Sequence, residues 1–214
     1  MLAKRSNFDF GRIGKVPMGL SRLICVFLVG WLLLSPSLAM AEDSVLPSDV
    51  FTAIMLKALN YDRNIDRQTQ EKITIGIVCL ADDAKSRDFA AQILENISGV
   101  QTNFRLKDKP VEAKILFLKR GFEKEKFKAQ LKQDKIAVLV MVQEDSSINK
   151  IIFETTRILR INSICYNSEC VHEGAGLGIV LRDNKPRMLI NLSATQQEGS
   201  DYGGKFLALC EVMK

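Results

Sequence analysis

The chain has 214 residues, of which 47% are hydrophobic and 26% are charged, and its formal net charge is +5 at pH 7. This length favours one main domain that can bury a core without staples. Five of the 30 basic residues and one of the 25 acidic residues lie within 1–41, so residues 42–214 carry a net charge of +1. A nearly neutral domain gives no electrostatic reason to expect nucleic acid as a partner.

The first 41 residues have the pattern of a secretory signal peptide. Basic residues precede a continuous apolar run from Leu23 to Leu34, and Ala39 and Ala41 form a small-residue cleavage site. The apolar run is shorter than the roughly 20 residues that a membrane-spanning helix needs. We therefore expect cleavage of 1–41 and a periplasmic domain at 42–214. An uncleaved N-terminal anchor is the alternative, and we expect that translation starts at either Met1 or Met18.

The remaining chain alternates between helical and extended patterns. Near-continuous apolar runs at 73–80 and 136–142 predict strands that are buried on both faces of a sheet. Shorter strands are expected at 104–106, 112–119 and 163–166, and helices at 47–59, 83–99, 123–133 and 148–159.

The C-terminal region begins with two apolar runs, at 177–181 and 188–192, on either side of the turn-forming residues 183–186. This pattern predicts a β-hairpin, followed by a short segment that Ser193 caps and Gly199 ends. Helical spacing of apolar residues predicts a last helix over 206–213. The elements together predict an α/β fold, with a layered and mostly parallel sheet, flanking helices and a C-terminal antiparallel hairpin.

Four cysteines follow the predicted signal peptide: Cys79, Cys165, Cys170 and Cys210. Cys165 and Cys170 flank a four-residue polar segment, which we expect to be a loop closed by a disulfide in an exported protein. Cys79 lies in an apolar strand and Cys210 on the apolar face of the predicted last helix. We expect both to be buried free thiols.

No residue pattern predicts catalysis, a cofactor or a metal site. Gly174, Gly176 and Gly178 precede or open a strand, whereas a phosphate-binding loop opens a helix, so they indicate a tight turn or a close backbone approach. Asp82 and Asp83 follow a strand and fit a helix cap better than an acidic catalytic pocket. The single histidine, His172, has no ligand set or nucleophile nearby in the sequence. We therefore expect a protein that is not an enzyme.

The C-terminal region resembles the YfiR-like family of small periplasmic proteins. The resemblance rests on Gly174-Ala175 before the first hairpin strand, on Ile190-Asn191-Leu192 at the end of the second, and on Lys205 in the closing segment. The order of elements from Ser48 to Lys214 is similar to that of the family, which has a comparable α/β layout. A local disulfide near Cys165 and Cys170 is also implied by this resemblance, and a second bond of Cys79 is absent or rerouted to Cys210.

The resemblance implies a regulator that acts by binding. The best-understood YfiR-like protein holds a membrane diguanylate cyclase inactive through its periplasmic sensor domain, and an OmpA-like lipoprotein captures the inhibitor. By this resemblance we expect a role in cyclic-di-GMP signalling, a cyclase or other sensor protein as partner, and a homodimer. The segment between the cysteines with His172, and the hairpin edge, are the candidate contact regions.

A small-ligand-binding module is the alternative interpretation. Open α/β sheets bind small molecules at the carboxyl ends of their strands, here near Asp82-Asp83 and Gln143-Glu144-Asp145. Such a protein would sense a periplasmic metabolite or supply a transporter. A structural envelope protein is a third interpretation, and no feature of the sequence distinguishes it.

Overall fold

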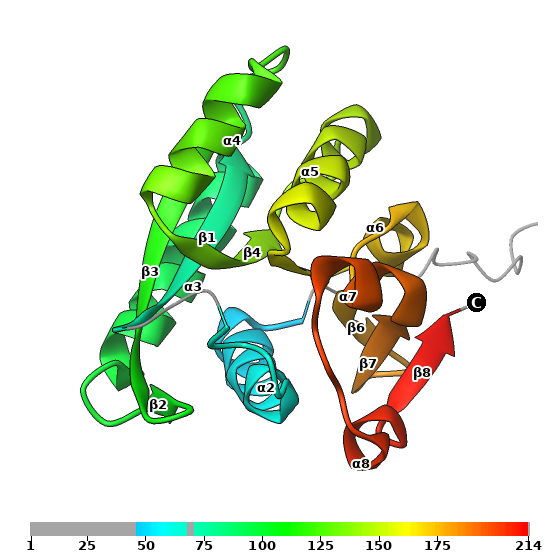
Figure 1. Ribbon diagram of the computed structural model, residues 1–214. Helices are drawn as coiled ribbons and strands as arrows, with labels where there is room; N and C mark the ends of the chain where they lie inside the picture. Colours follow the sequence, from blue (N-terminus) through cyan, green and yellow to red (C-terminus); the bar gives the residue numbers. More distant parts are fainter. Residues whose placement is uncertain (1–45, 68–70, 214) are drawn as a thin grey trace, which may run out of the picture. The chain divides into compact units, whose positions relative to one another are not determined.

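A computed structural model describes residues 46–67 and 71–213, all within one compact unit that spans Asp43–Lys214 (Figure 1). The predicted signal peptide, with Ala39 and Ala41, lies outside the described residues. Eight strands form one sheet in the order β2-β3-β1-β4-β5-β6-β7-β8. Their bounds are β1 Ile73–Leu80, β2 Arg105–Leu106, β3 Lys109–Leu118, β4 Ile136–Met141, β5 Asn162–Cys165, β6 Leu177–Arg182, β7 Lys185–Asn191 and β8 Cys210–Met213.

The central strands β3, β1, β4, β5 and β6 are all parallel. The chain first moves from β1 to β3 on one side, and then crosses back to place β4 on the other side of β1. This reversal is the topological switch point of a doubly wound sheet. The predicted α/β fold, with a mostly parallel sheet, is confirmed.

Helices cover both faces of this sheet, as buried parallel strands require. The described helices are α2 Ser48–Tyr61, α3 Ala84–Val100, α4 Lys124–Gln133, α5 Ser146–Leu159, α6 Ser168–Glu173, α7 Leu192–Glu198 and α8 Gly204–Leu207. One core packs α2, α3 and Phe206 of α8 against the sheet, and a second core packs α4, α5 and α6 against the other face. Figure 1 shows α4 and α5 side by side along the second face. Within 46–67 and 71–213, no helix is both long and apolar enough to cross a membrane.

The predicted C-terminal hairpin is confirmed as the antiparallel pair of β6 and β7. Its loop consists of Asp183 and Asn184, whose φ angles of 52° and 56° are both left-handed. Asp and Asn tolerate this conformation in two-residue hairpin loops, and such loops match the twist of the strands. The helix that follows begins two residues earlier than expected, because Asn191 and not Ser193 accepts the capping hydrogen bond, from Ala194 N at 3.0 Å.

The predicted helix over 206–213 is wrong. The chain forms only the one-turn helix α8 and then the strand β8, which pairs in parallel with β7 at the edge of the sheet. Leu209 and Val212 are exposed, so the apolar residues that suggested one buried helical face do not share one. Cys210 lies on β8 and is half-buried, not on a helix.

The predicted loop between Cys165 and Cys170 is also wrong. Cys165 ends β5 and Cys170 lies in the short helix α6, which Asn167 caps by accepting a hydrogen bond from Cys170 N at 2.8 Å. Both thiols are buried and free in this structure, as is Cys79 on β1. Burial first, and then the neighbouring Cys165 thiol, raise the pKa of the Cys170 thiol. The disulfide itself stays a prediction.

Candidate functional site

The loops that follow the parallel strands meet at the carboxyl edge of the sheet, around the switch point between β1 and β4. The polar side chains of these loops form the group that we call the switch-point cluster: Asp82, Asp83, Arg120, Glu144, Asp145 and Tyr166. In doubly wound sheets this position is where ligands bind.

Arg120 connects two of these loops across the switch point. It follows β3, and its guanidinium lies 3.5 Å (Nε) from Asp82 Oδ2 and 2.6 Å (Nη1) from Asp145 Oδ2. The Arg120 and Asp82 side chains are 65% and 62% exposed, so solvent screens their interaction and either group can exchange its partner. Arg120 therefore offers a mostly exposed guanidinium to an anionic group, which can replace Asp82, while the largely buried Asp145 holds the other side of the guanidinium.

The aspartates of the cluster also begin the two helices that flank the switch point. Asp83 caps α3 by accepting hydrogen bonds from Lys85 N and Ser86 N, at 3.1 and 3.3 Å. Asp145 caps α5 in the same way, and a side-chain hydrogen bond from Ser147, followed by the backbone bonds of the cap, lowers the pKa of its carboxyl group. The predicted capping role of Asp83 is thus confirmed, whereas Asp82 is left to pair with Arg120.

Tyr166 supplies an aromatic side of the cluster. It follows β5 directly, its hydroxyl donates a hydrogen bond to Glu144 Oε1, and its ring lies 5.3 Å from the ring of Phe89 on α3. Burial first, and then the contact with Glu144, raise the pKa of the Tyr166 hydroxyl. Tyr166 is therefore a neutral hydrogen-bonding group at neutral pH, placed next to a carboxylate.

Buried amide side chains fix the loop after β4 through hydrogen bonds. The buried Gln143 accepts a hydrogen bond from Asp145 N at 2.6 Å and donates one to Asn149 at 2.5 Å. Asn149 in turn donates to Glu173 on α6, at 2.7 Å. These contacts hold Glu144 and Asp145 in place while their carboxylates remain at the edge of the sheet.

A second polar group lies at the opposite, amino-terminal edge of the sheet. Glu198 ends α7 and is fully buried, and its carboxylate accepts hydrogen bonds from Ser163 N at 3.0 Å, from Ser163 Oγ at 2.5 Å and from Thr156 Oγ1 at 2.8 Å. Burial raises the pKa of Glu198 to about 7, although the bonds from Ser163 and Thr156 oppose the shift. The Glu198 carboxylate can lie this close to the backbone before β6 because residue 176 is a glycine. A Cβ atom at Gly176 would lie 2.6 Å from Glu198 Oε2.

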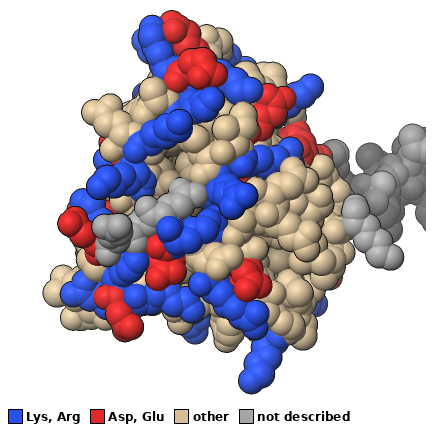
Figure 2. All heavy atoms as spheres, in the orientation of Figure 1, with Lys and Arg blue, Asp and Glu red and all other residues tan. Residues whose placement is uncertain are grey.

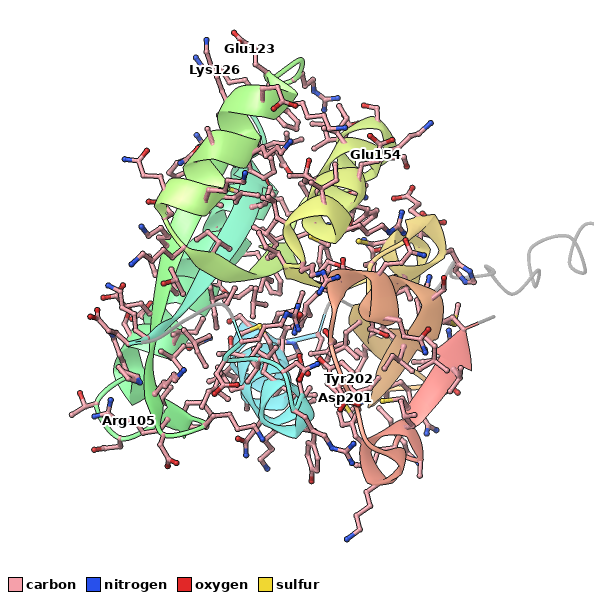
Figure 3. All side chains as sticks on the ribbon, viewed as in Figure 1. Arg105, Glu123, Lys126, Glu154, Asp201 and Tyr202 are labelled. Atoms are coloured by element: carbon pink, nitrogen blue, oxygen red, sulfur yellow. The ribbon has the colours of Figure 1, made fainter. Side chains whose placement is uncertain are left out.

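Asp62 extends this group to the end of α2. Its buried carboxylate accepts hydrogen bonds from Asn162 Nδ2 at 2.6 Å, Asn64 N at 2.9 Å and Asp201 N at 2.8 Å. Figure 3 shows Asp201 and Tyr202 beside α2. The two carboxylates and the side chains that donate to them form the group that we call the buried carboxylate network: Asp62, Thr156, Asn162, Ser163 and Glu198.

Most of the residues that carry the resemblance to the YfiR-like family lie around the start of β6 and the end of β7. Gly174 ends α6 with a φ of 126°, and Ala175 and Ile190 are completely buried. Asn191 N donates to Gly176 O at 3.0 Å, which closes the start of β6 against the end of β7. Leu192 packs against the core, and Lys205 is exposed on α8.

His172, the contact residue expected from the sequence, is exposed in the last turn of α6 and is not part of the switch-point cluster. Gly178 allows α6 to pack closely against β6, because a Cβ atom there would collide with Val171 Cγ2 of α6. Among the described residues, no group of three or more His, Cys, Asp or Glu side chains is arranged to hold a metal ion.

Sequence reasoning placed Asp82-Asp83 and Gln143-Glu144-Asp145 at one edge of the sheet, and the structure brings them together there. It missed Arg120 and Tyr166. Both follow a strand by one or two residues, and this position alone would have placed them at the carboxyl edge of a parallel sheet.

No protein-family model matches the sequence, and a comparison with curated proteins finds no match. Solved structures match in fold at low identity. A conserved domain protein from Vibrio cholerae is 11% identical with a TM-score of 0.53, over 78% of this chain and 60% of that one. An ABC domain in complex with L-Trp from Streptococcus pneumonia is 10% identical with a TM-score of 0.50, over 73% and 60%.

A ligand-free substrate binding protein with adhesive properties from Clostridium difficile is 12% identical, with a TM-score of 0.49 over 71% of this chain and 57% of that one. The matches thus span less than two thirds of these longer chains. At these identities, the two matches with TM-scores of 0.53 and 0.50 establish a shared α/β fold and no more.

Proposed function

We propose that this protein is a binding module that holds a small ligand at the switch-point cluster. The observation that carries the proposal is Arg120, which bridges Asp82 and Asp145 across the switch point and is itself mostly exposed. A ligand at this position can replace Asp82 at little cost, since an exposed ion pair contributes about 0–1 kcal/mol. The fold shared with an ABC domain described in complex with L-Trp supports a search for such a ligand.

The chemistry of the cluster fits a small zwitterion. Arg120 can bind a carboxylate in a bidentate manner, and Asp82 and Glu144 can accept hydrogen bonds from an ammonium group. Tyr166 and Phe89 add an aromatic surface beside Glu144. An amino acid carries all of the complementary groups, so free L-amino acids are the probes of choice.

The test is a thermal-unfolding screen of residues 42–214 with each of the twenty L-amino acids, followed by calorimetric titration of every compound that raises the midpoint. We expect at least one amino acid to bind, and Arg120→Ala to weaken that binding by about tenfold or more. Arg105→Ala is the matched control, because Arg105 is exposed on β2 at the other end of the sheet (Figure 3). Equal binding by the Arg120 and Arg105 variants would place the ligand elsewhere.

A second candidate function is the regulation of a membrane diguanylate cyclase through its periplasmic domain. The residues that favour it are those that resemble the YfiR-like family, which, apart from Lys205 on α8, lie around the start of β6 and the end of β7. In this case the protein acts by stoichiometric binding, as a homodimer in the periplasm, and an OmpA-like lipoprotein is a further partner. The expected absence of enzymatic activity belongs to both functions.

Affinity capture distinguishes the two functions. The chain is tagged at Lys214, expressed with its own N-terminal segment, crosslinked in cells and purified for mass spectrometry. Recovery of an inner-membrane protein with a periplasmic sensor domain supports the regulator. Recovery of a small molecule without a protein supports the ligand-binding module and identifies its ligand.

A further inference from the structure

A pocket of about 260 Å³ lies between the C-terminal ends of α4 and α5, over the start of β4. It is at the amino-terminal edge of the sheet and therefore separate from the switch-point cluster. Its lining is Leu131, Lys132, Lys135, Ile136, Leu159 and Ile161, and we call it the amino-edge pocket.

The walls of the amino-edge pocket are aliphatic and fixed. Leu131, Ile136 and Ile161 are buried members of the core that packs α4 and α5 on the sheet, and Leu159 packs against the same core. These side chains are held by their neighbours, so the pocket does not depend on a rearrangement. An aliphatic wall of this kind favours an apolar part of a ligand.

The polar part of the lining consists of two lysines. Lys132 and Lys135 are exposed, and neither forms an ion pair with another described residue. The carboxylate between them in sequence, Asp134, lies 2.9 Å from Lys114 Nζ on β3 and is already engaged. Figure 2 shows that Lys and Arg side chains are frequent over α4 and below it. The local charge at the pocket is therefore positive.

Two basic residues beside the pocket, at the ends of α4 and α5, have the left-handed backbone conformation that glycine usually adopts. Lys135 follows α4 with a φ of 50°, and Arg160 caps the end of α5 with a φ of 56°. A residue with a side chain costs about 1 kcal/mol or more in this conformation. A cation near a helix C-terminus recovers about 0.3–1 kcal/mol of that cost. These preferences of helix ends account for the two basic residues but not for the aliphatic pocket beside them.

We propose that the amino-edge pocket binds a small monocarboxylate with an apolar body. The body fills the aliphatic walls, and the carboxylate lies between the ammonium groups of Lys132 and Lys135. A dry cavity of about 150 Å³ holds benzene, so this pocket has room for a medium-length alkyl chain. The proposal concerns a site distinct from the proposed amino-acid site and stands or fails independently of it.

Octanoate is the probe, with octanamide as its uncharged counterpart. Titration calorimetry and methyl NMR spectra of residues 42–214 follow binding at concentrations up to about 10 mM. We expect octanoate to bind and to shift the methyl signals of Leu159 and Ile161, and octanamide to bind at least about tenfold more weakly.

Two variants test the assignment. The double change Lys132→Ala and Lys135→Ala is expected to weaken octanoate about tenfold and to leave octanamide unchanged. Leu159→Trp fills the half-buried side of the pocket and is expected to abolish binding of both probes. Lys126→Ala is the matched control, because Lys126 is on the same helix but pairs with Glu123 at its far end, 2.7 Å away (Figure 3).

Circular dichroism and the unfolding midpoint verify that each variant is folded. The proposal is overturned if octanoate does not bind to the wild-type protein, if octanamide binds equally well, or if the double lysine variant binds octanoate as the wild type does. Binding by Leu159→Trp with wild-type affinity would also overturn it, since the pocket would then not be the site.

Discussion

The two edges of the sheet use charged residues in opposite ways. At the carboxyl edge, Arg120 and Asp82 are mostly exposed and can exchange partners with solvent or a ligand. At the amino-terminal edge, Asp62 and Glu198 are fully buried and every oxygen of their carboxylates accepts a hydrogen bond from the protein. The first arrangement contributes little to stability and is available for binding, whereas the second joins distant segments and is costly to break.

The buried edge is also where distant parts of the chain are tied together. Arg67 donates hydrogen bonds to the carbonyl oxygens of Arg160, at 2.6 Å, and of Glu198 and Gly199. These bonds connect the segment after α2 with the ends of α5 and α7. Burial, the main cause, lowers the pKa of the Arg67 guanidinium, although nearby Asp62 opposes the shift. The network therefore acts as a structural clamp for the C-terminal region.

The largest effect is expected from Asp62→Ala. The change leaves Asn162 Nδ2 and Asp201 N without their buried acceptor, so the free energy of unfolding should fall by about 3 kcal/mol or more in urea denaturation. Asp88→Ala, which removes an exposed carboxylate from α3, should stay within about 0.5 kcal/mol of the wild type. Equal losses in the two variants would remove the distinction between the edges.

The pH dependence of stability gives the next largest effect. The pKa of Glu198 is about 7 in the folded protein and near 4.5 in the unfolded chain, so the folded state binds the proton more tightly. Its contribution is complete below pH 4.5 and is lost as the pH rises to about 7, a change of roughly 3 kcal/mol. Glu198→Gln cannot ionise, and its stability should exceed that of the wild type increasingly over this range. Parallel pH profiles of the two proteins would contradict this assignment.

A disulfide between Cys165 and Cys170 would attach α6 covalently to the carboxyl edge. If it forms in the exported protein, non-reducing peptide mapping will find the two residues in one linked pair, and reduction should lower the free energy of unfolding by about 2 kcal/mol. Alkylation of both thiols in protein purified from the periplasm, after unfolding without reductant, would show that the bond is absent.

The smallest effect on stability is expected from Arg120→Ala. The lost ion pairs with Asp82 and Asp145 are exposed on the arginine side, so the free energy of unfolding should change by less than about 1 kcal/mol. The same variant should show the loss of ligand binding described above. A loss of stability comparable to that of Asp62→Ala would mean that the carboxyl edge is structural as well.

The sequence predicted the strands best where both faces are buried. The near-continuous apolar runs at β1 and β4 are typical of strands that are buried on both faces. The Asp183-Asn184 pair is typical of a two-residue hairpin loop. The last helix could not be predicted correctly, because the four residues 210–213, with apolar side chains at 210, 212 and 213, also suit an edge strand. Their pairing with β7 is a contact between segments that are distant in the sequence, which local patterns do not record.

The candidate site was predictable in its loops but not in its contacts. The position of Asp83 after a strand indicated its cap, and the positions of Asp82-Asp83 and Gln143-Glu144-Asp145 indicated the edge of the sheet. The pairing of Arg120 with these loops depends on the strand order, in which β3 and β4 lie on either side of β1. The buried carboxylate network was missed altogether, because Asp62 and Glu198 lie in polar segments that resemble ordinary surface sequence.

The most direct test of the contrast between the edges is site-specific photocrosslinking in living cells. A photoreactive amino acid replaces Lys119, next to Arg120 at the carboxyl edge, or Lys72, just before β1 at the amino-terminal edge. Both positions are exposed, so the two proteins are matched. We predict that a ligand or protein is captured from position 119 and that position 72 captures markedly less. Absence of capture from position 119, with or without capture from position 72, would contradict the assignment of binding to the carboxyl edge.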